Sequence, residues 1–205
     1  VRKLKKDNPG IPVVTYVKTS ADVKAETDIC CTSANAVKII ESLNVDKVIF
    51  LPDEYLAKYV ASKTNVKIIS WNGKCEVHEQ FTDKEIIELR KKYPNLKVVS
   101  HPECPPEVIK ASDYTGSTGS MINYVKNTNA KDIFLVTECS MSDNIQIENP
   151  NINFVKPCNL CPHMKKITLQ GILKSLKEEN NYIEIDKKII QRARGAIERM
   201  IAVGR

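Results

Sequence analysis

The 205-residue chain contains an internal repeat that spans much of its length. Its two copies read PVVTYVKTSADVKAETDICCTSANAVKIIESLNVDKVIFLP and KVVSHPECPPEVIKASDYTGSTGSMINYVKNTNAKDIFLVT, and they align Val13 with Val98. A single inserted residue further along shifts the alignment by one position, so that Cys75 aligns with Cys161. A repeat of this length is too long for a solenoid unit and long enough for a small domain. We therefore expect tandem copies of one small domain.

Within each copy, short continuous apolar runs alternate with segments of helical apolar spacing. Such runs are typical of parallel strands whose sheet is covered on both faces, and the alternation is typical of βαβ units. The expected strands are 13–17, 47–51, 66–70, 96–100 and 132–136, and the expected helices are 34–43, 54–62 and 120–126. The predicted fold class is α/β, with tandem αβα units and short parallel sheets.

The repeat continues beyond its second copy, where Thr82 aligns with Thr168 in the same register as the two cysteines. We expect one αβα unit at 1–74, a second at 75–160 and a C-terminal helical segment at 161–205. A third equivalent cysteine, one repeat period before Cys75, would lie upstream of Val1. The expected parent protein therefore has three units around a pseudo-threefold axis.

This chain would then hold two of the three units and be inactive alone. Its helices at 168–179 and 186–203 would normally complete the missing N-terminal unit. Without that unit, each helix would leave an apolar stripe without a partner. The stripes are Ile172, Leu173 and Leu176 in the first helix, and Ile189, Ile190, Ala193 and Ile197 in the second.

Composition narrows the classes of function. The net charge is +6, the basic residues are spread along the chain and only 6% of residues are aromatic, which fits binding of small anions better than binding of nucleic acid. No apolar run is long enough to cross a membrane, so no membrane partner is expected. The start, VRKLKKDNPG, has no signal-peptide pattern, which predicts a reducing, cytoplasmic location in which disulfides are unlikely.

Seven cysteines in such a compartment favour metal or cluster ligation. The C-x-x-C formed by Cys158 and Cys161 is compatible with a zinc knuckle, a redox pair or an iron–sulfur ligand, but only Cys161 has a partner, Cys75, at the repeat spacing. Three equivalent thiolates suit a [4Fe–4S] cluster with one open iron, whereas structural zinc prefers four closed ligands. The remaining cysteines are expected to be small buried fillers: Cys30, Cys31, Cys104 and Cys139.

Two hydroxyl pairs, Thr32–Ser33 and Ser117–Thr118, each precede an expected helix. They can be simple N-caps, or they can bind an anion together with the free N–H groups of the helix end. Gly116 and Gly119 flank the second pair and allow close backbone approach, which favours anion binding there.

His101 and Glu103 follow the expected strand 96–100, and Tyr16 holds the matching place in the first copy. Ligands of open α/β sheets bind off the carboxyl ends of strands. A His and a Glu in that position suit proton transfer during a condensation.

These motifs resemble those of the quinolinate synthase family: Y-V-x-T-S, T-S-A-N-A, G-x-C-x-V-H, H-P-E-C, G-S-T-G and C-P-x-M. The resemblance implies three αβα units around one [4Fe–4S] cluster, and condensation of iminoaspartate with dihydroxyacetone phosphate. It implies cluster ligation by Cys75 and Cys161. The implied catalytic residues are Tyr16, His101 and Glu103, and the implied substrate-binding residues are Tyr16, Ser33, His101, Glu103, Ser117 and Thr118.

One position departs from the family pattern, because Lys18 stands where an Asn is expected. The implied partners are the two small-molecule substrates, with a functional association to the L-aspartate oxidase or aspartate dehydrogenase that supplies iminoaspartate. The competing interpretation is a non-catalytic α/β module that binds a phosphorylated ligand and holds zinc through its cysteines.

Overall fold

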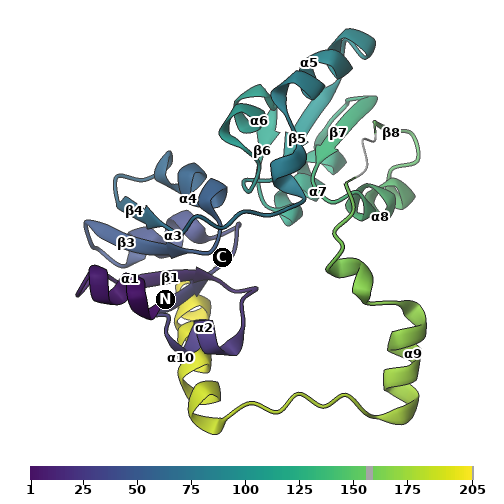
Figure 1. Ribbon diagram of the computed structural model, residues 1–205. Coiled ribbons are helices and arrows are strands. Elements are labelled where there is room, and N and C mark those ends of the chain that lie inside the picture. The colour runs from purple at the N-terminus through teal and green to yellow at the C-terminus, as the bar shows by residue number, and fades with distance from the viewer. Residues whose placement is uncertain (156–158, 205) are drawn as a thin grey trace.

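The computed structural model describes residues 1–155 and 159–204, and these form two four-stranded parallel sheets (Figure 1). The first sheet has the order β2-β1-β3-β4 and consists of β1 (Val13–Tyr16), β2 (Ile29–Cys31), β3 (Lys47–Leu51) and β4 (Lys67–Ser70). The second has the order β6-β5-β7-β8 and consists of β5 (Lys97–Ser100), β6 (Tyr114–Thr115), β7 (Asp132–Val136) and β8 (Asn153–Phe154). The shared strand order confirms the predicted tandem of α/β units.

The strand registers reproduce the alignment of the sequence repeat. Val14 pairs with Ile29 in the first sheet, and their equivalents in the second copy, Val99 and Tyr114, pair in the second sheet. The inserted residue of the second copy precedes the last strand of its sheet. Lys47 pairs with Lys67 in the first sheet, whereas Asp132, the equivalent of Lys47, pairs with Asn153 in the second. The repeat is therefore structural at the level of single residue pairs.

Helices flank both sheets, and several of them begin at a side-chain cap. Thr82 and Thr168, which are equivalent in the repeat, cap α5 and α9 by accepting the N–H of the third residue that follows. The helices are α1 (Arg2–Asp7), α2 (Ala21–Ala25), α3 (Ala36–Ser42), α4 (Glu54–Ala61), α5 (Asp83–Lys92), α6 (Pro106–Ala111), α7 (Thr118–Asn127), α8 (Ser140–Glu148), α9 (Leu169–Glu178) and α10 (Lys187–Val203), with short 3-10 turns η1 (His78–Gln80) and η2 (Met164–Lys166). Sequence patterning located α3, α4 and α7 but not α2, α6 or α8, because these carry too few apolar positions to show a period.

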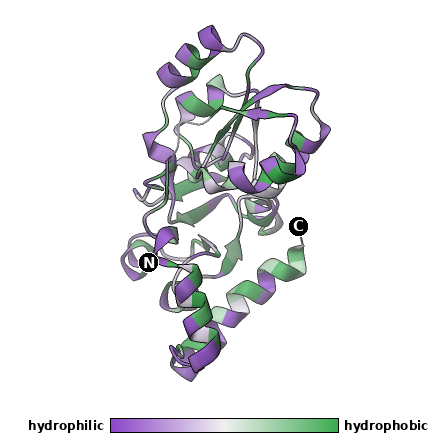
Figure 2. Ribbon diagram, turned by 90° about the vertical axis from the view of Figure 1, so that its right-hand side faces the viewer, coloured by the Kyte–Doolittle hydropathy of each residue, from purple (hydrophilic) through white to green (hydrophobic). Residues whose placement is uncertain are grey.

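The core lies between each sheet and its helices. Val14 and Phe50 are fully buried in the first unit, and Val98 and Phe134 are buried in the second. Figure 2 shows the hydrophobic strands inside and the alternating hydropathy along the helices. None of the described helices is both long and apolar enough to cross a membrane.

The cysteines expected to be buried fillers are buried: Cys30, Cys31, Cys104 and Cys139. The expectation that disulfides are unlikely is wrong for Cys139, which is disulfide-bonded. Cys158 lies outside the described residues.

The two C-terminal helices differ in their surroundings. α9 stands away from both sheets and buries no residue, and Ile172, Leu173 and Leu176 of its stripe are 46%, 53% and 72% exposed (Figure 1). The expectation of an unpartnered stripe is wrong for α10, which packs against α2, β2 and α3 of the first unit and buries Ala193 and Ala196.

Polar contacts hold α10 in that place. Arg192 lies 3.3 Å from Glu26, and the guanidinium of Arg199 donates a hydrogen bond to the backbone carbonyl of Asp28. The amphipathic pattern of this segment predicted a buried face correctly, but it could not say which surface would cover it.

An aspartate at equivalent positions of the two copies binds the backbone of the first strand in each sheet. Asp28 accepts the N–H of Val13 at 2.8 Å, and its equivalent in the second copy, Asp113, accepts the N–H of Val98 at the same distance. Burial opposes ionisation of Asp113, but the Val98 N–H and the Arg90 and Lys97 side chains outweigh it and hold its pKa below the usual range. Because its pKa is lower in the folded chain, the ionised Asp113 carboxylate stabilises the fold at pH values above its unfolded pKa of about 3.9. This stabilisation is lost as the pH falls through the folded pKa.

We expect Asp113→Asn to lower the free energy of unfolding by about 1 kcal/mol at neutral pH, a value discounted because solvent reaches the carboxylate and screens it. The deficit should shrink as the pH falls below about 4, because the wild-type carboxylate then becomes protonated. Urea unfolding across this pH range measures both effects, with Asp46→Asn, at an exposed position, as the control. A deficit that stays constant from neutral to strongly acidic pH would count against this contribution.

Candidate active site

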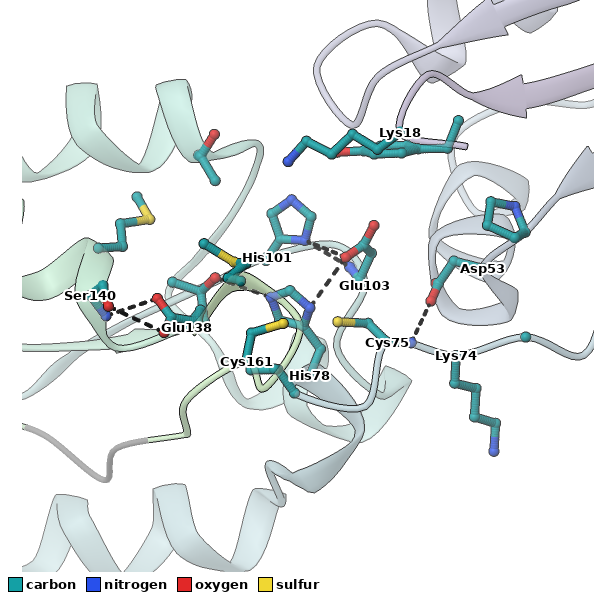
Figure 3. A pocket seen from close by; sticks show the side chains of 18 of the residues that line it. Lys18, Asp53, Lys74, Cys75, His78, His101, Glu103, Glu138, Ser140 and Cys161 are labelled. Carbon is teal, nitrogen blue, oxygen red and sulfur yellow. Dashed lines mark hydrogen bonds and ion pairs between the residues drawn. The ribbon is translucent and has the colours of Figure 1, made fainter. Parts of the chain in front are cut away.

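A cavity of about 590 Å³ lies where the strands of both sheets end (Figure 3). The residues at or after the carboxyl ends of β1, β3, β5 and β7 line it, as expected for a ligand site in parallel α/β sheets. The two loops that follow β4 and β8 supply the cysteines. The lining residues used below are Tyr16, Lys18, Asp53, Gly73, Cys75, His78, His101, Glu103, Thr118, Thr137, Glu138, Ser140 and Cys161.

Glu103 lies between two histidines. Its Oε2 is 3.2 Å from Nδ1 of His78 and 3.6 Å from Nδ1 of His101, and the two imidazole rings stack with their centroids 4.8 Å apart. Nε2 of His78 is paired with the Thr137 hydroxyl at 3.1 Å, and Nε2 of His101 with the Ser33 hydroxyl at 3.2 Å. His78 and His101 thus converge on one carboxylate, and Ser33 of the first sheet's unit joins this network through His101.

The two histidines have opposite protonation tendencies. Burial lowers the pKa of His101 to about 4, and the nearby charge of Glu103 only partly opposes this. Burial also disfavours protonation of His78, but Cys75 and Glu103 outweigh it and raise the pKa of His78 to about 9. Near neutral pH the site therefore holds a cationic His78 and a neutral His101, and such a separation is typical of acid–base sites.

Burial opposes ionisation of Glu103, yet its contacts with His78 and His101 and the charge of Lys18 lower its pKa. Tyr16 has a raised pKa, first because of burial and then because of the negative Glu103, while a hydrogen bond with Ser33 acts the other way. Figure 3 shows the Lys18 side chain extending toward the His101 ring. The lining of the cavity thus combines a protonated phenol, an ammonium group and a carboxylate.

One group of side chains is able to hold a metal ion. Ligand atoms of Cys75, His78 and Glu103 all lie within 4.8 Å of one another. Nδ1 of His78 is buried and lies 3.2 Å from Oε2 of Glu103, so it could bind an ion only after giving up its proton. Cys161 lines the same cavity and packs against the same buried cluster as Cys75.

The hydroxyl pairs take different places. Ser117 caps α7, because its Oγ accepts the N–H of Ser120 at 3.3 Å, and Thr118 lines the cavity. Gly116 is required at its position, since a Cβ there would meet the Ser120 hydroxyl at 2.7 Å. In the first unit, Thr32 forms a local turn with Asn35, and Ser33 reaches His101.

Sequence reasoning missed Thr137, Asp53 and Glu138 as parts of the cavity. Asp53 and Glu138 occupy equivalent positions of the two copies, so the repeat already contained a signal for them. The motif G-x-C-x-V-H placed His78 close to Cys75, but it did not predict the contact of His78 with Glu103, because His78 aligns with Met164 and so has no equivalent in the other copy.

Comparison with known proteins gives consistent matches. Residues 1–202 match the family described as Quinolinate synthetase A protein. The chain is 54% identical to Quinolinate synthase 1 of Mesorhizobium japonicum, covering 99% of this chain and 63% of that protein. It is 53% identical to Quinolinate synthase of Xylella fastidiosa strain Temecula1 (99% and 60% covered) and 56% identical to Quinolinate synthase of Sinorhizobium fredii (98% and 56% covered).

The chain therefore spans less than two thirds of the length of these relatives. A solved mutant structure of the laminin-binding adhesin Lmb from Streptococcus agalactiae matches 96% of this chain and 100% of that one, with a TM-score of 0.23 and 11% identity. That similarity is too low to support an argument about fold or function.

Proposed function

Because the chain belongs to the quinolinate synthetase A protein family, we propose that it supplies part of the active site of a quinolinate synthase. The proposed reaction condenses iminoaspartate with dihydroxyacetone phosphate and releases phosphate and water. The observation that supports it best is the convergence of both repeat-related cysteines and the His78–Glu103–His101 network on one cavity.

The donor set fits part of an iron–sulfur site. Cys75 and Cys161 are thiols at equivalent positions of two units, both at the wall of the same cavity. We propose that they hold a [4Fe–4S] cluster, with a further ligand from sequence outside this chain. When bound, such a cluster with an open iron supplies a Lewis acid for substrate oxygens.

The remaining residues would bind the substrates and move protons. Nδ1 of His101 accepts the backbone N–H of Glu103 at 3.3 Å, so the neutral imidazole carries its proton on Nε2, where it pairs with Ser33 and can donate that proton. The backbone N–H of Glu103 fixes the orientation of the ring by donating to Nδ1, and Tyr16 adds a hydroxyl donor beside Ser33. The ammonium group of Lys18 attracts the carboxylates and phosphate of the two anionic substrates.

The assay of quinolinate formation tests this proposal. The gene product that contains this chain, purified without oxygen, should form quinolinate from iminoaspartate and dihydroxyacetone phosphate, with one phosphate released per product. The proposal fails if neither quinolinate nor phosphate appears while the protein remains folded and holds its iron.

A second candidate is favoured by one specific observation. A thiol, an imidazole and a carboxylate within 4.8 Å form a donor set that also suits zinc. A zinc-holding α/β module that binds a phosphorylated ligand would bind phosphate without forming quinolinate, and would contain zinc instead of iron.

The hydroxyl pair at the start of α7 gives a further prediction. Replacing both Ser117 and Thr118 by Ala should weaken the binding of dihydroxyacetone phosphate by about 1–3 kcal/mol, because the backbone N–H groups and the helix dipole remain. The KM for this substrate measures the effect. Ser62→Ala, at an exposed position that does not line this cavity, is the control and should leave the KM unchanged. An unchanged KM in the double variant would remove these residues from the substrate site.

We also propose the division into units at 1–74, 75–160 and 161–205, which follows from the repeat. The cytoplasmic location and the supply of iminoaspartate by an L-aspartate oxidase or aspartate dehydrogenase are further proposals.

A further inference from the structure

We propose that Asp53 and Glu138 are positioning residues, each of which holds in place the cysteine-bearing loop that follows the last strand of its own sheet. Asp53 comes shortly after β3, and Glu138 comes equally soon after β7, at equivalent positions of the repeat. We call residues 71–77 the Cys75 loop and residues 159–165 the Cys161 loop. Only the identity of the group that the two thiols bind rests on the proposed function; the positioning of the two loops does not.

The Cys75 loop is tied to β3 by a buried carboxylate. Asp53 is 5% exposed, and its Oδ1 accepts the N–H of Leu56 at 2.6 Å while its Oδ2 accepts the N–H of Cys75 at 3.0 Å. Figure 3 shows this second bond. One side chain therefore caps α4 and fixes the backbone of the cysteine itself. Hydrogen bonds to a charged acceptor are among the stronger ones in a protein interior.

Backbone contacts bring the same loop close to the strand end. The N–H of Glu54 donates to the carbonyl of Gly73 at 2.7 Å. A Cβ on Gly73 would lie 2.5 Å from the carbonyl oxygen of Pro52, so only glycine fits this approach. The Cys75 loop is thus held on both sides of its glycine.

The Cys161 loop repeats the backbone contact but not the carboxylate contact. The N–H of Cys139 donates to the carbonyl of Asn159 at 3.3 Å, matching the contact between Glu54 and Gly73. Glu138 accepts the N–H of Ser140 at 2.9 Å and its hydroxyl at 3.2 Å, and it does not reach Cys161 directly.

Lys165 provides the link in the second unit. Its backbone N–H donates to the carbonyl of Cys161 at 3.1 Å, and its ammonium donates to the Ser140 hydroxyl at 2.6 Å and lies 3.9 Å from Glu138. The Lys165 side chain is 49% exposed, so solvent weakens this link. We therefore infer that the Cys75 loop is held more firmly than the Cys161 loop.

The test is a map of thiol reactivity in this chain without any cluster. Alkylation rates of Cys75 and Cys161 are measured by mass spectrometry of their peptides, on the pH plateau where both thiols are ionised, so that a change in thiol pKa has no effect. Asp53→Asn should raise the rate of Cys75 about tenfold, because a buried charged hydrogen bond is lost, and leave Cys161 unchanged. Glu138→Gln should raise the rate of Cys161 about threefold at most and leave Cys75 unchanged.

The specificity of each variant for its own cysteine separates positioning from general destabilisation. The buried Cys31 and Cys104 report unfolding, since both would become reactive in an unfolded variant. A folded Asp53→Asn variant whose Cys75 rate stays within about twofold of the wild type overturns the proposal.

If Asp53→Asn does not fold, hydrogen exchange of the wild-type chain decides. The amide of Cys75 should be protected and that of Cys161 should exchange faster, and equal exchange of the two overturns the proposal. In the intact gene product, Asp53→Asn should also speed the loss of iron to a chelator. A wild-type protein that never binds iron would refute the proposed function and leave the thiol map valid.

Discussion

Cys75→Ser and Cys161→Ser should each remove the iron–sulfur cluster from the gene product that contains this chain. A hydroxyl replaces a thiolate ligand, and a cluster that lacks one of its thiolates is weakly held. Iron and acid-labile sulfide analysis after anaerobic purification measures the loss, which we expect to be nearly complete for both variants.

Cys158→Ser is the matched control, since it alters the other cysteine of the C-x-x-C, which has no partner at the repeat spacing. It should retain most of the iron. A Cys161→Ser variant with normal iron and sulfide would show that the repeat spacing does not identify the ligands.

His101→Ala and Glu103→Gln should have the largest effects on turnover among variants that keep the cluster. General acid–base groups contribute about 10²–10⁴-fold to the rate, so we expect turnover to fall within this range. Glu103→Gln keeps the shape of the side chain but removes the charge that contacts both histidines. The quinolinate assay, combined with iron analysis of each variant, measures the loss of chemistry at constant cluster content.

Glu107→Gln is the control for these two variants, because Glu107 is exposed on α6 and is not among the residues that line the cavity. It should leave turnover within about twofold of the wild type. If His101→Ala and Glu107→Gln had equal turnover, the role assigned to His101 would be incorrect.

Most of the fold follows from the repeat and from apolar patterning. The runs at 47–51 and 132–136 are strands with the predicted bounds, because a continuous apolar run at a sheet centre leaves little choice of conformation. The place of α10 could not be predicted in the same way. Its apolar stripe requires an apolar partner surface but does not say which one. The surface formed by α2 and β2 meets that requirement, and so would the sheet of the expected N-terminal unit.

The site was only partly predictable for a related reason. His101 and Glu103 lie together after one strand, so the strand-end rule found them. His78 reaches the same carboxylate from a 3-10 turn in a different segment, and such a contact depends on how separate segments pack. Sequence spacing within one copy contains no information on that packing.

The metal content of the anaerobically purified gene product tests the central claim most directly. We expect a brown protein with about four iron and four sulfide ions per chain, as a [4Fe–4S] cluster requires. A folded, colourless protein with one equivalent of zinc and no iron would contradict the account and favour the zinc-holding binding module.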